Sequence, residues 1–486
     1  MRHDLLAARE AHRELFRTRG REPYPTWHGR THTAADVRAR FASLAKTKEA
    51  VTVAGRLVGT REHGGVRFLD LKDDSGTLQL LCRSDALSSE LFHLLDALDP
   101  GDLLTASGPV VKTQAGELSV DVTTWAPLAK ALRPPPDPRS GLRDEEERAR
   151  HREVDLLANP ETRRVFDVRV KLLHGLRAFL TGEGFIEVET PILQSQPGGA
   201  AAHPFRTHHR ALDLEFTLRI SPELYLKRLM IGGYEKVFEV GKAFRNEGID
   251  RQHNPEFTIC EFYWAYTAVD DLIPFTERLV STLLTEVVGS PRLTAQGQTL
   301  DFTPPWPRVS VVDAVEETAG VNLGSDRDPR AYEKALTKLE VNLPEDRTLP
   351  NLMDALINAA VRSNATSPLV LLGAPVELEP LAKRSPDEPR LVQRMQILVG
   401  GMELIKAYTE ENDPWEQERR FREQASLRGS SEVHPLDAAY IEALKVGLPP
   451  TAGWGMGVDR LVMLATGRPS IRDVLFFPLL RPERHD

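Results

Sequence analysis

The chain has 486 residues and a formal net charge of −9, with 27% charged and 41% hydrophobic residues. This length predicts about two or three domains, with enough buried surface to fold without disulfides. Cys82 and Cys260 are far apart and are its only cysteines, which excludes a disulfide framework and a cysteine-bound zinc site. They fit a reducing compartment, so we expect a cytoplasmic protein. No apolar run approaches ~18 residues, so we expect no membrane span.

The first segment, residues 1–48, is predicted to be helical and basic. Helical patterns at 1–20 and 34–46 flank the interruption Tyr24-Pro25-Thr26-Trp27. Residues 1–50 carry eleven Lys and Arg residues against six Asp and Glu residues. Such a local positive charge on an otherwise acidic protein can attract a polyanion.

Residues 49–132 have the alternating pattern of a small β-barrel. The five expected strands begin near Val51, Phe68, Leu78, Leu103 and Leu118. A helical pattern at 87–98 separates the third strand from the fourth. Five short strands with one inserted helix, within about 75 residues, are typical of an all-β oligonucleotide-binding (OB) barrel.

The rest of the chain is predicted to be a linker, residues 133–160, and one large α+β domain, residues 161–486. The linker starts with a stiff proline-rich stretch and continues with the charged run from Arg143 to Arg152, for which we expect a helix. The large domain is expected to contain, in chain order, a helix at about 160–182, a strand before Pro191, helical insertions at 324–366, and a glycine-rich turn at 453–457 followed by a helix.

Several motifs of this domain occur in the order found in one enzyme family. Phe244 to Gly248 with His253 to Phe257 resembles the second signature motif of class II aminoacyl-tRNA synthetases, and Gly453 to Arg460 resembles the third. The helix and strand that end at Pro191 resemble the first. Further strings are similar to the bacterial-type class II lysyl-tRNA synthetases: Gly198–Ala201, Thr207–His209, Ser221–Lys227 and Gly447–Gly453.

The resemblance covers essentially the whole chain and carries implications for the fold. It implies a catalytic domain built on an antiparallel sheet, preceded by an OB-fold barrel that binds the anticodon. It also implies a homodimer formed through the first motif around Pro191. The sequence itself shows only an apolar helix and strand there.

Strand periodicity predicts a polar face at the second motif. Alternate residues of a strand share a face, so Arg245 and Glu247 are expected to point the same way. Phe257, Glu261 and Tyr263, with Ile259 between them, are expected to share a face of the next strand. A buried row of such groups requires charged ligands or partners. The alternative is internal Arg–Glu pairing on a sheet.

Adenylate formation brings two anions together, the substrate carboxylate and the α-phosphate of ATP. A guanidinium can bridge both by bidentate hydrogen bonds, and the resemblance assigns this role to Arg245. It implies that Arg460 and His253 support the leaving pyrophosphate, that Phe257 stacks on adenine, and that Glu247 accepts a hydrogen bond from the adenine amino group. The residues implied to contact ATP are Arg245, Glu247, His253, Phe257, Glu403 and Arg460. No protein nucleophile is implied.

The same resemblance implies a pocket for lysine. Glu410 and Tyr263 would hold the ε-ammonium, with Tyr408 beside the aliphatic stem. Glu223, Glu261 and the Gly199 carbonyl would receive the α-ammonium, and Arg245 the carboxylate. A buried cation needs such anionic partners. Each acidic residue taken alone could also be ordinary surface charge.

The barrel carries three residues implied to read anticodon bases: Phe68, Gln79 and Glu117. Aromatic stacking contributes about 1–3 kcal/mol per base, and hydrogen bonds add discrimination. The alternative for Phe68 is a place in the barrel core.

Three positions depart from the family pattern. Gln396 stands where the family has a magnesium-binding glutamate, Lys406 where it has an asparagine, and Trp454 where it has a small aliphatic residue. The implied Mg²⁺ ligands are therefore Glu403 and the weaker Gln396. We hypothesise that Lys406 replaces a metal contact to the phosphates or blocks carboxylate binding. Neutral drift at the pocket rim is the alternative.

The expected activity is that of a lysine–tRNA ligase, which uses ATP to form lysyl-adenylate and transfers the lysyl group to the 3′ end of tRNA(Lys). One alternative is a paralogue that adenylates lysine or a related amino acid for another acceptor, or with altered catalysis. Another is a tRNA-binding or regulatory protein without activity. Lysine-dependent exchange of pyrophosphate into ATP, followed by a tRNA charging assay, separates the three.

Overall fold

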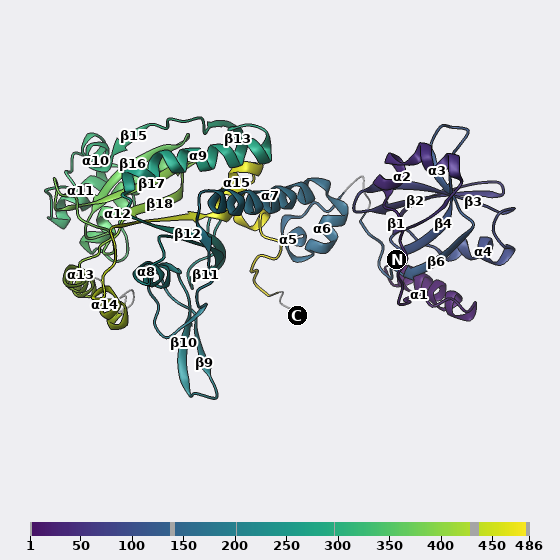
Figure 1. Ribbon diagram of the computed structural model, residues 1–486, viewed down its shortest axis with the longest axis horizontal. Helices are drawn as coiled ribbons and strands as arrows, with labels where there is room; N and C mark the ends of the chain where they lie inside the picture. The colour runs from purple at the N-terminus through teal and green to yellow at the C-terminus, as the bar shows by residue number, and fades with distance from the viewer. Residues whose placement is uncertain (1, 137–140, 201, 296, 428–436, 483–486) are drawn as a thin grey trace. The chain divides into compact units, whose positions relative to one another are not determined.

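A computed structural model describes residues 2–136, 141–200, 202–295, 297–427 and 437–482. The chain divides into two compact units, Met1–Arg143 and Asp144–Asp486, which are treated separately below (Figure 1). The division falls inside the segment that the sequence analysis takes as a linker. In the part of the chain that is described, no helix is both long and apolar enough to cross a membrane.

The first unit is a closed barrel with helices around it. Its elements are α1 (Arg2–Thr18), α2 (Ala34–Ala39), α3 (Phe41–Thr47), β1 (Ala50–His63), β2 (Val66–Asp73), β3 (Gly76–Arg83), α4 (Ser89–Leu94), the 3₁₀ turn η1 (Leu95–Ala97), β4 (Leu103–Lys112), β5 (Leu118–Asp121) and β6 (Thr124–Ala129). The strand order is β1-β2-β3-β5-β4-β6, and an additional β1–β4 pairing closes the barrel. The five predicted strands therefore form the ring.

Two details of this unit differ from expectation. The single helix predicted over 34–46 is two helices, because the backbone at Arg40 (φ −100°, ψ 8°) leaves helical geometry. Strand β6 is an unpredicted addition that pairs with β4 and places Trp125 in the core. The barrel closes tightly at Gly108, where an added Cβ would lie 1.9 Å from the carbonyl oxygen of Asp121.

The second unit mixes helices with one large sheet. Its first elements are α5 (Glu145–Arg150), α6 (Arg152–Ala158), α7 (Pro160–Gly182), β7 (Ile186–Glu187), β8 (Leu193–Gln194), β9 (Arg206–His209), β10 (Leu214–Leu218), α8 (Glu223–Ile231), β11 (Lys236–Phe244), β12 (Glu256–Ala265), α9 (Val269–Val288), β13 (Arg292–Ala295) and β14 (Gln298–Asp301). They continue with β15 (Arg308–Ser310), α10 (Val311–Ala319), α11 (Pro329–Lys338), α12 (Leu349–Ala360), η2 (Arg362–Asn364), β16 (Leu369–Pro375), β17 (Leu391–Val399), β18 (Met402–Thr409), α13 (Pro414–Leu427), α14 (Ala438–Leu444), β19 (Thr451–Gly457), α15 (Val458–Thr466) and η3 (Ile471–Asp473).

The large sheet separates a helical core from an open face. Its strand order is β15-β16-β17-β18-β19-β12-β11-β7, antiparallel except for the edge pairs β15–β16 and β11–β7. Helices α7, α9 and α15 cover one face and bury apolar side chains such as Leu176, Leu279 and Leu461 against it (Figure 1). The predicted long helix at 160–182 is α7, and the insertions at 324–366 are α11, α12 and η2.

One buried ion pair fixes helix α15 against the sheet. Asp459 accepts a hydrogen bond from Arg169 Nη1 on α7 at 2.5 Å and another from the backbone N–H of Thr258 on β12 at 2.8 Å. The Asp459 side chain is 2% exposed. Since Arg460 is the next residue, this contact also sets where its side chain leaves the helix.

The strand predicted through Arg245 and Glu247 ends before them, although both residues line the cavity described below. Strand β11 ends at Phe244, so Arg245 and Glu247 lie in the loop after it. The Arg245 N–H donates to the Pro255 carbonyl at 2.8 Å, and the Asn246 N–H donates to the His203 carbonyl at 2.7 Å. The first bond continues the register of β11 with β12, but Pro255 has no N–H to donate in return. The second bond turns the backbone toward His203, so the ladder ends here.

Asp459→Ala is expected to destabilise the protein strongly, because it leaves Arg169 buried without its carboxylate. We expect the free energy of unfolding to fall by roughly 3–5 kcal/mol in a denaturant titration. Asp301→Ala is the matched control: its bridge to Arg292 spans 3.0 Å between side chains that are 41% and 68% exposed. Such an exposed pair adds little to stability, because water and salt screen its charges. Equal losses in the two variants would contradict this view of Asp459.

Candidate active site

A cavity of about 530 Å³ opens on the face of the sheet formed by β12, β18 and β19. Its floor is β19, which presents glycine at alternate positions, Gly453, Gly455 and Gly457. Gly453 lies between Tyr263 and Tyr408 on the flanking strands, and Gly455 lies between Glu261 and Lys406. The missing side chains leave a trough, and the neighbours on β12 and β18 form its walls.

One end of the trough gathers carboxylates. The Ser221 hydroxyl donates to Glu261 Oε1 at 2.9 Å, and the Tyr408 hydroxyl donates to Glu223 Oε1 at 2.7 Å. Lys227, one turn after Glu223 on α8, donates to the same Glu223 oxygen at 2.7 Å. Glu223, Glu261 and Lys227 are all buried, so their charges interact through little water.

Burial and neighbouring charges shift the pKa values of Glu261 and Lys227 at this end of the trough. Desolvation raises the pKa of the Glu261 carboxyl to about 8, and the negative charge of Glu223 adds to the effect. Desolvation lowers the pKa of Lys227, but Glu223 and Glu410 outweigh it and raise that pKa above its usual value. Lys227 therefore remains an ammonium, while Glu261 is mostly protonated at neutral pH.

Glu410 lies behind the trough floor rather than on its wall. Lys227 contacts its Oε2, while its Oε1 is buried without a hydrogen-bond partner. A Cβ at Gly453 would lie 2.0 Å from that Oε1 and 2.6 Å from Tyr263 Cε1. Glycine at 453 therefore leaves this unused acceptor open toward the trough.

The middle of the trough holds Arg245. Its guanidinium carbon is 5.1 Å from the centre of the Phe257 ring, and its Nε is buried without a hydrogen-bond partner. Burial lowers the pKa of Arg245, opposed by Glu247, Glu261 and Glu403. A half-buried guanidinium whose Nε donor is unused is suited to binding anions.

Beyond Arg245 the trough is bordered by Arg460 and His253. Arg460 Nη2 lies 3.1 Å from His253 Nε2, and Arg460 Nη1 donates to the Glu403 carbonyl oxygen at 2.6 Å. The His253 ring also contacts Asp250, with its Nδ1 2.8 Å from Oδ2. These contacts hold two potential cations beside each other at the open end.

The side chains predicted to hold Mg²⁺ do not fit a divalent cation. The Gln396 amide donates to Glu403 Oε2, and Arg362 Nε donates to the Gln396 oxygen at 3.3 Å. Burial alone would raise the pKa of Glu403, but Lys406, Arg362, Arg394 and Arg460 outweigh it and lower that pKa to about 2. No group of three or more potential His, Cys, Asp or Glu metal ligands occurs within the described ranges. A hard cation requires free oxygen ligands.

Trp454, which departs from the family pattern, packs in the hydrophobic core and points away from the trough. Its side chain is 2% exposed, stacks on Phe262 with ring centres 4.7 Å apart, and donates from Nε1 to Thr276 Oγ1 at 2.9 Å. It alternates with Gly453 and Gly455 along β19, so it faces helix α9.

The structure brings most of the predicted residues to one cavity. Those that line it are Gly199, Glu223, Arg245, Glu247, His253, Phe257, Glu261, Tyr263, Glu403, Tyr408 and Arg460. Glu410 and Gln396 lie behind it. Sequence reasoning gave no role to Lys227, Glu379 or Arg362. The four-residue spacing of Glu223 and Lys227 on a helix was the one available signal, since Glu379 and Arg362 meet the site only through long-range contacts.

The predicted base-reading residues lie on the outside of the barrel in the first unit. Phe68 on β2 is half-buried and pairs with Leu81 on β3. Gln79 lies two residues before Leu81 on the same strand, so the side chains of Phe68 and Gln79 share a face of the sheet. Gln79 Oε1 accepts from the Ser119 hydroxyl at 2.8 Å. Phe68 is not part of the buried core cluster, while Glu117 is exposed in the loop between β4 and β5.

Comparison with known protein families assigns each of the two units to a family. Residues 144–481 match the class II tRNA synthetases (D, K and N), and residues 51–128 match the OB-fold nucleic acid binding domain. The chain belongs to the class II tRNA synthetase family. It is an aminoacyl-tRNA synthetase with ATP as co-substrate, and the predicted fold, an α+β catalytic domain after an OB-fold barrel, is confirmed.

Relatives that match over nearly the full length of the chain are lysine–tRNA ligases. The chain is 45% identical over 484 residues to a lysine–tRNA ligase of Roseiflexus castenholzii, covering 99% of both chains. It is 42% identical to the lysine–tRNA ligase of Carboxydothermus hydrogenoformans, covering 99% of this chain and 98% of that one. It is 40% identical to that of Bacillus subtilis, covering 99% and 97%.

Proposed function

We propose that this protein is a lysine–tRNA ligase: it activates L-lysine with ATP and transfers the lysyl group to tRNA(Lys). The observation that carries the proposal is the charge balance at the carboxylate end of the trough. With Glu261 ionised, this end holds three carboxylates, Glu223, Glu261 and Glu410, against the buried Lys227 and the half-buried Arg245. A ligand with two ammonium groups and one carboxylate supplies the missing positive charge. The three relatives named above are lysine–tRNA ligases, which supports the same substrate.

The geometry supports a mechanism without a protein nucleophile. The unused Glu410 Oε1 and the Tyr263 hydroxyl are suited to the ε-ammonium, and Glu223 and Glu261 to the α-ammonium. Arg245 would then hold the carboxylate of lysine against the α-phosphate of ATP. A carboxylate oxygen bonds to phosphorus as the bond to pyrophosphate breaks, and Arg460 with His253 stabilises the departing charge.

The second step requires tRNA. A ribose hydroxyl at its 3′ end attacks the lysyl carbonyl, the ester forms, and AMP leaves. The barrel surface around Phe68, Gln79 and Glu117 is proposed to bind the anticodon, since an aromatic ring beside polar groups suits unstacked bases. We further propose a homodimer in the cytoplasm. Mg²⁺ is proposed to arrive as the counterion of ATP.

The direct test is a two-step assay. Lysine-dependent exchange of pyrophosphate into ATP is expected, and charging of tRNA(Lys) is expected to follow. Exchange without charging would favour the paralogue that modifies another acceptor. Neither reaction would favour a tRNA-binding protein without activity.

Lysine binding is expected to release a proton at neutral pH. Glu261, with a pKa of about 8, is mostly protonated without ligand, and an ammonium beside it stabilises the carboxylate. The affinity should therefore rise by up to about tenfold per pH unit below that pKa and level off above it. Calorimetry in buffers of different ionisation enthalpy measures the proton. Glu261→Gln should reduce its release, and burial, which also raises the pKa of Glu410, accounts for any remainder. A binding enthalpy independent of buffer would contradict this assignment.

Gly453→Ala is expected to lose lysine binding, because its methyl would lie 2.0 Å from Glu410 Oε1. Overpacking of this kind costs about 1–3 kcal/mol, so affinity should fall by roughly tenfold or more. At Gly455 an added Cβ meets Glu261 Cγ at an ordinary 3.5 Å, so Gly455→Ala should lose less. Calorimetry measures the lysine affinity of both variants. Equal losses of affinity would contradict the role of Gly453.

Phe68→Ala is expected to weaken charging of full-length tRNA. Loss of one stacked base should raise the KM for tRNA on the order of 10- to 100-fold. Lysine-dependent pyrophosphate exchange should not change, and neither should charging of a minihelix without an anticodon. If the minihelix is affected equally, Phe68 acts through the stability of the barrel.

A further inference from the structure

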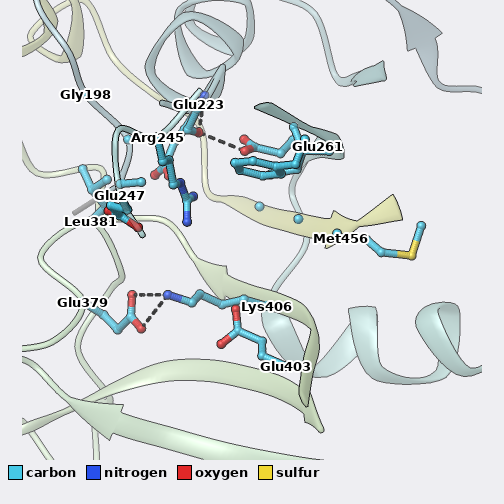
Figure 2. Close-up of a pocket in the computed structure, with 18 of the residues that line it drawn as sticks. Gly198, Glu223, Arg245, Glu247, Glu261, Glu379, Leu381, Glu403, Lys406 and Met456 are labelled. Carbon is cyan, nitrogen blue, oxygen red and sulfur yellow. Dashed lines mark hydrogen bonds and ion pairs between the residues drawn. The ribbon is translucent and has the colours of Figure 1, made fainter. Parts of the chain in front are cut away.

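A cluster of four cations lies at the open end of the trough and behind it. It consists of Arg362, Arg394, Lys406 and Arg460, and all four act on the Glu403 carboxylate. Figure 2 shows Lys406 and Glu403 on the same strand, with Glu379 opposite. This end is the one proposed above to receive the phosphates of ATP, and the inference below rests on that proposed function.

Each carboxylate of this end already has a protein partner. Glu379 takes the Lys406 ammonium at 3.1 Å on Oε1 and 3.4 Å on Oε2, and its Oε1 also lies 3.3 Å from Arg394 Nε. Asp354 accepts from Arg362 at 2.8 Å. Together with the Gln396 amide on Glu403, these contacts leave no unpartnered carboxylate among Asp354, Glu379 and Glu403.

Lys406 is a cation of this cluster that a ligand can reach, as Arg362 and Arg460 are. Its side chain is 37% exposed and lines the trough, whereas Arg394 is 1% exposed and lies behind it. Gly455, its neighbour on β19, leaves open space beside it. Its bonds to Glu379 are long, so a phosphate oxygen can compete for the same ammonium.

The substitutions at 396 and 406 change charge in one direction. Relative to glutamate and asparagine, Gln396 removes one negative charge and Lys406 adds one positive charge. The sum, two positive units, equals the charge of one divalent cation. Both side chains lie opposite each other on β17 and β18, so the change is local.

We propose that Lys406 supplies the positive charge that a protein-held divalent cation would bring to the phosphates of ATP. This chain then binds ATP without a metal ion held by residues 396 and 403. Arg394 and Glu379 are positioning residues: Arg394 supports Glu379, and Glu379 holds the Lys406 ammonium at the trough wall in the absence of ligand.

The test measures ATP binding and metal binding separately from activity. Calorimetry with ATP in EDTA is expected to show binding by the parent protein. Lys406→Asn should weaken this metal-free binding by about tenfold or more, the effect of losing one charge-assisted hydrogen bond, and Lys406→Arg should retain most of it. The control is Lys445→Asn, which removes an exposed lysine directly after the end of α14. This variant should bind ATP as the parent protein does.

Two further variants distinguish binding to phosphate from a merely structural ion pair. Glu379→Gln releases Lys406 and should not weaken metal-free ATP binding, whereas a structural role predicts the same loss as in Lys406→Asn. Gln396→Glu combined with Lys406→Asn should create a metal site. Electron paramagnetic resonance with Mn²⁺ and a non-hydrolysable ATP analogue should count one more bound ion in that double variant than in the parent.

The opposite results overturn the proposal. If the parent binds ATP only with a divalent cation, or holds as many Mn²⁺ ions as the double variant, Lys406 does not replace a metal. Lysine-dependent pyrophosphate exchange, measured on the same samples, keeps the two failures apart. Exchange that persists leaves the ligase proposal standing while this inference falls, and its absence from the parent under every metal condition overturns both.

Discussion

Three glycines at alternate positions of one central strand are the constraint on which the site depends. A sheet packed on one face by helices normally carries side chains on the other, and these would fill the space above β19. Gly453, Gly455 and Gly457 leave that space open, while Trp454 and Met456 between them anchor the strand in the core. The same alternation therefore provides both the trough and its rigid support.

The trough sorts charge along its length. Carboxylates gather beside α8 at one end, cations gather around Glu403 at the other, and Arg245 lies between them. The buried members, Glu223, Glu261, Glu410 and Lys227, need partners, and the protein supplies only part of the set. A diamino acid and a polyphosphate complete it from opposite ends. Specificity and catalysis then follow from one arrangement of charge, without a reactive side chain.

The sequence predicted what local periodicity controls. The long helix at 160–182 and the ring of five barrel strands are present, and Phe257, Ile259, Glu261 and Tyr263 line one cavity, as strand alternation indicated. Alternation also turns Trp454 away from the site, although comparison by motif had marked it as a departure there. Periodicity missed the end of the strand at Phe244, where Pro255 lacks the N–H for the next pair and Asn246 bonds to His203 instead. Arg245 and Glu247 nevertheless line the same cavity.

The sequence pattern could not predict contacts between distant segments of the chain. Lys227 meets Glu410 across 183 positions of sequence, and Glu379 meets Lys406 from a separate loop. Neither pair leaves a signal in composition or spacing. These contacts nevertheless decide which carboxylates are free for a ligand, so they determine the chemistry of each end of the trough.

The most direct measurement of the central claim is a crystal structure with L-lysine and a non-hydrolysable ATP analogue bound. The account predicts the lysine carboxylate and the α-phosphate on the Arg245 guanidinium, with the distal ammonium beside Glu410 Oε1 and Tyr263. A lysine that lies in the reverse direction, or an Arg245 side chain that contacts neither group, would contradict it.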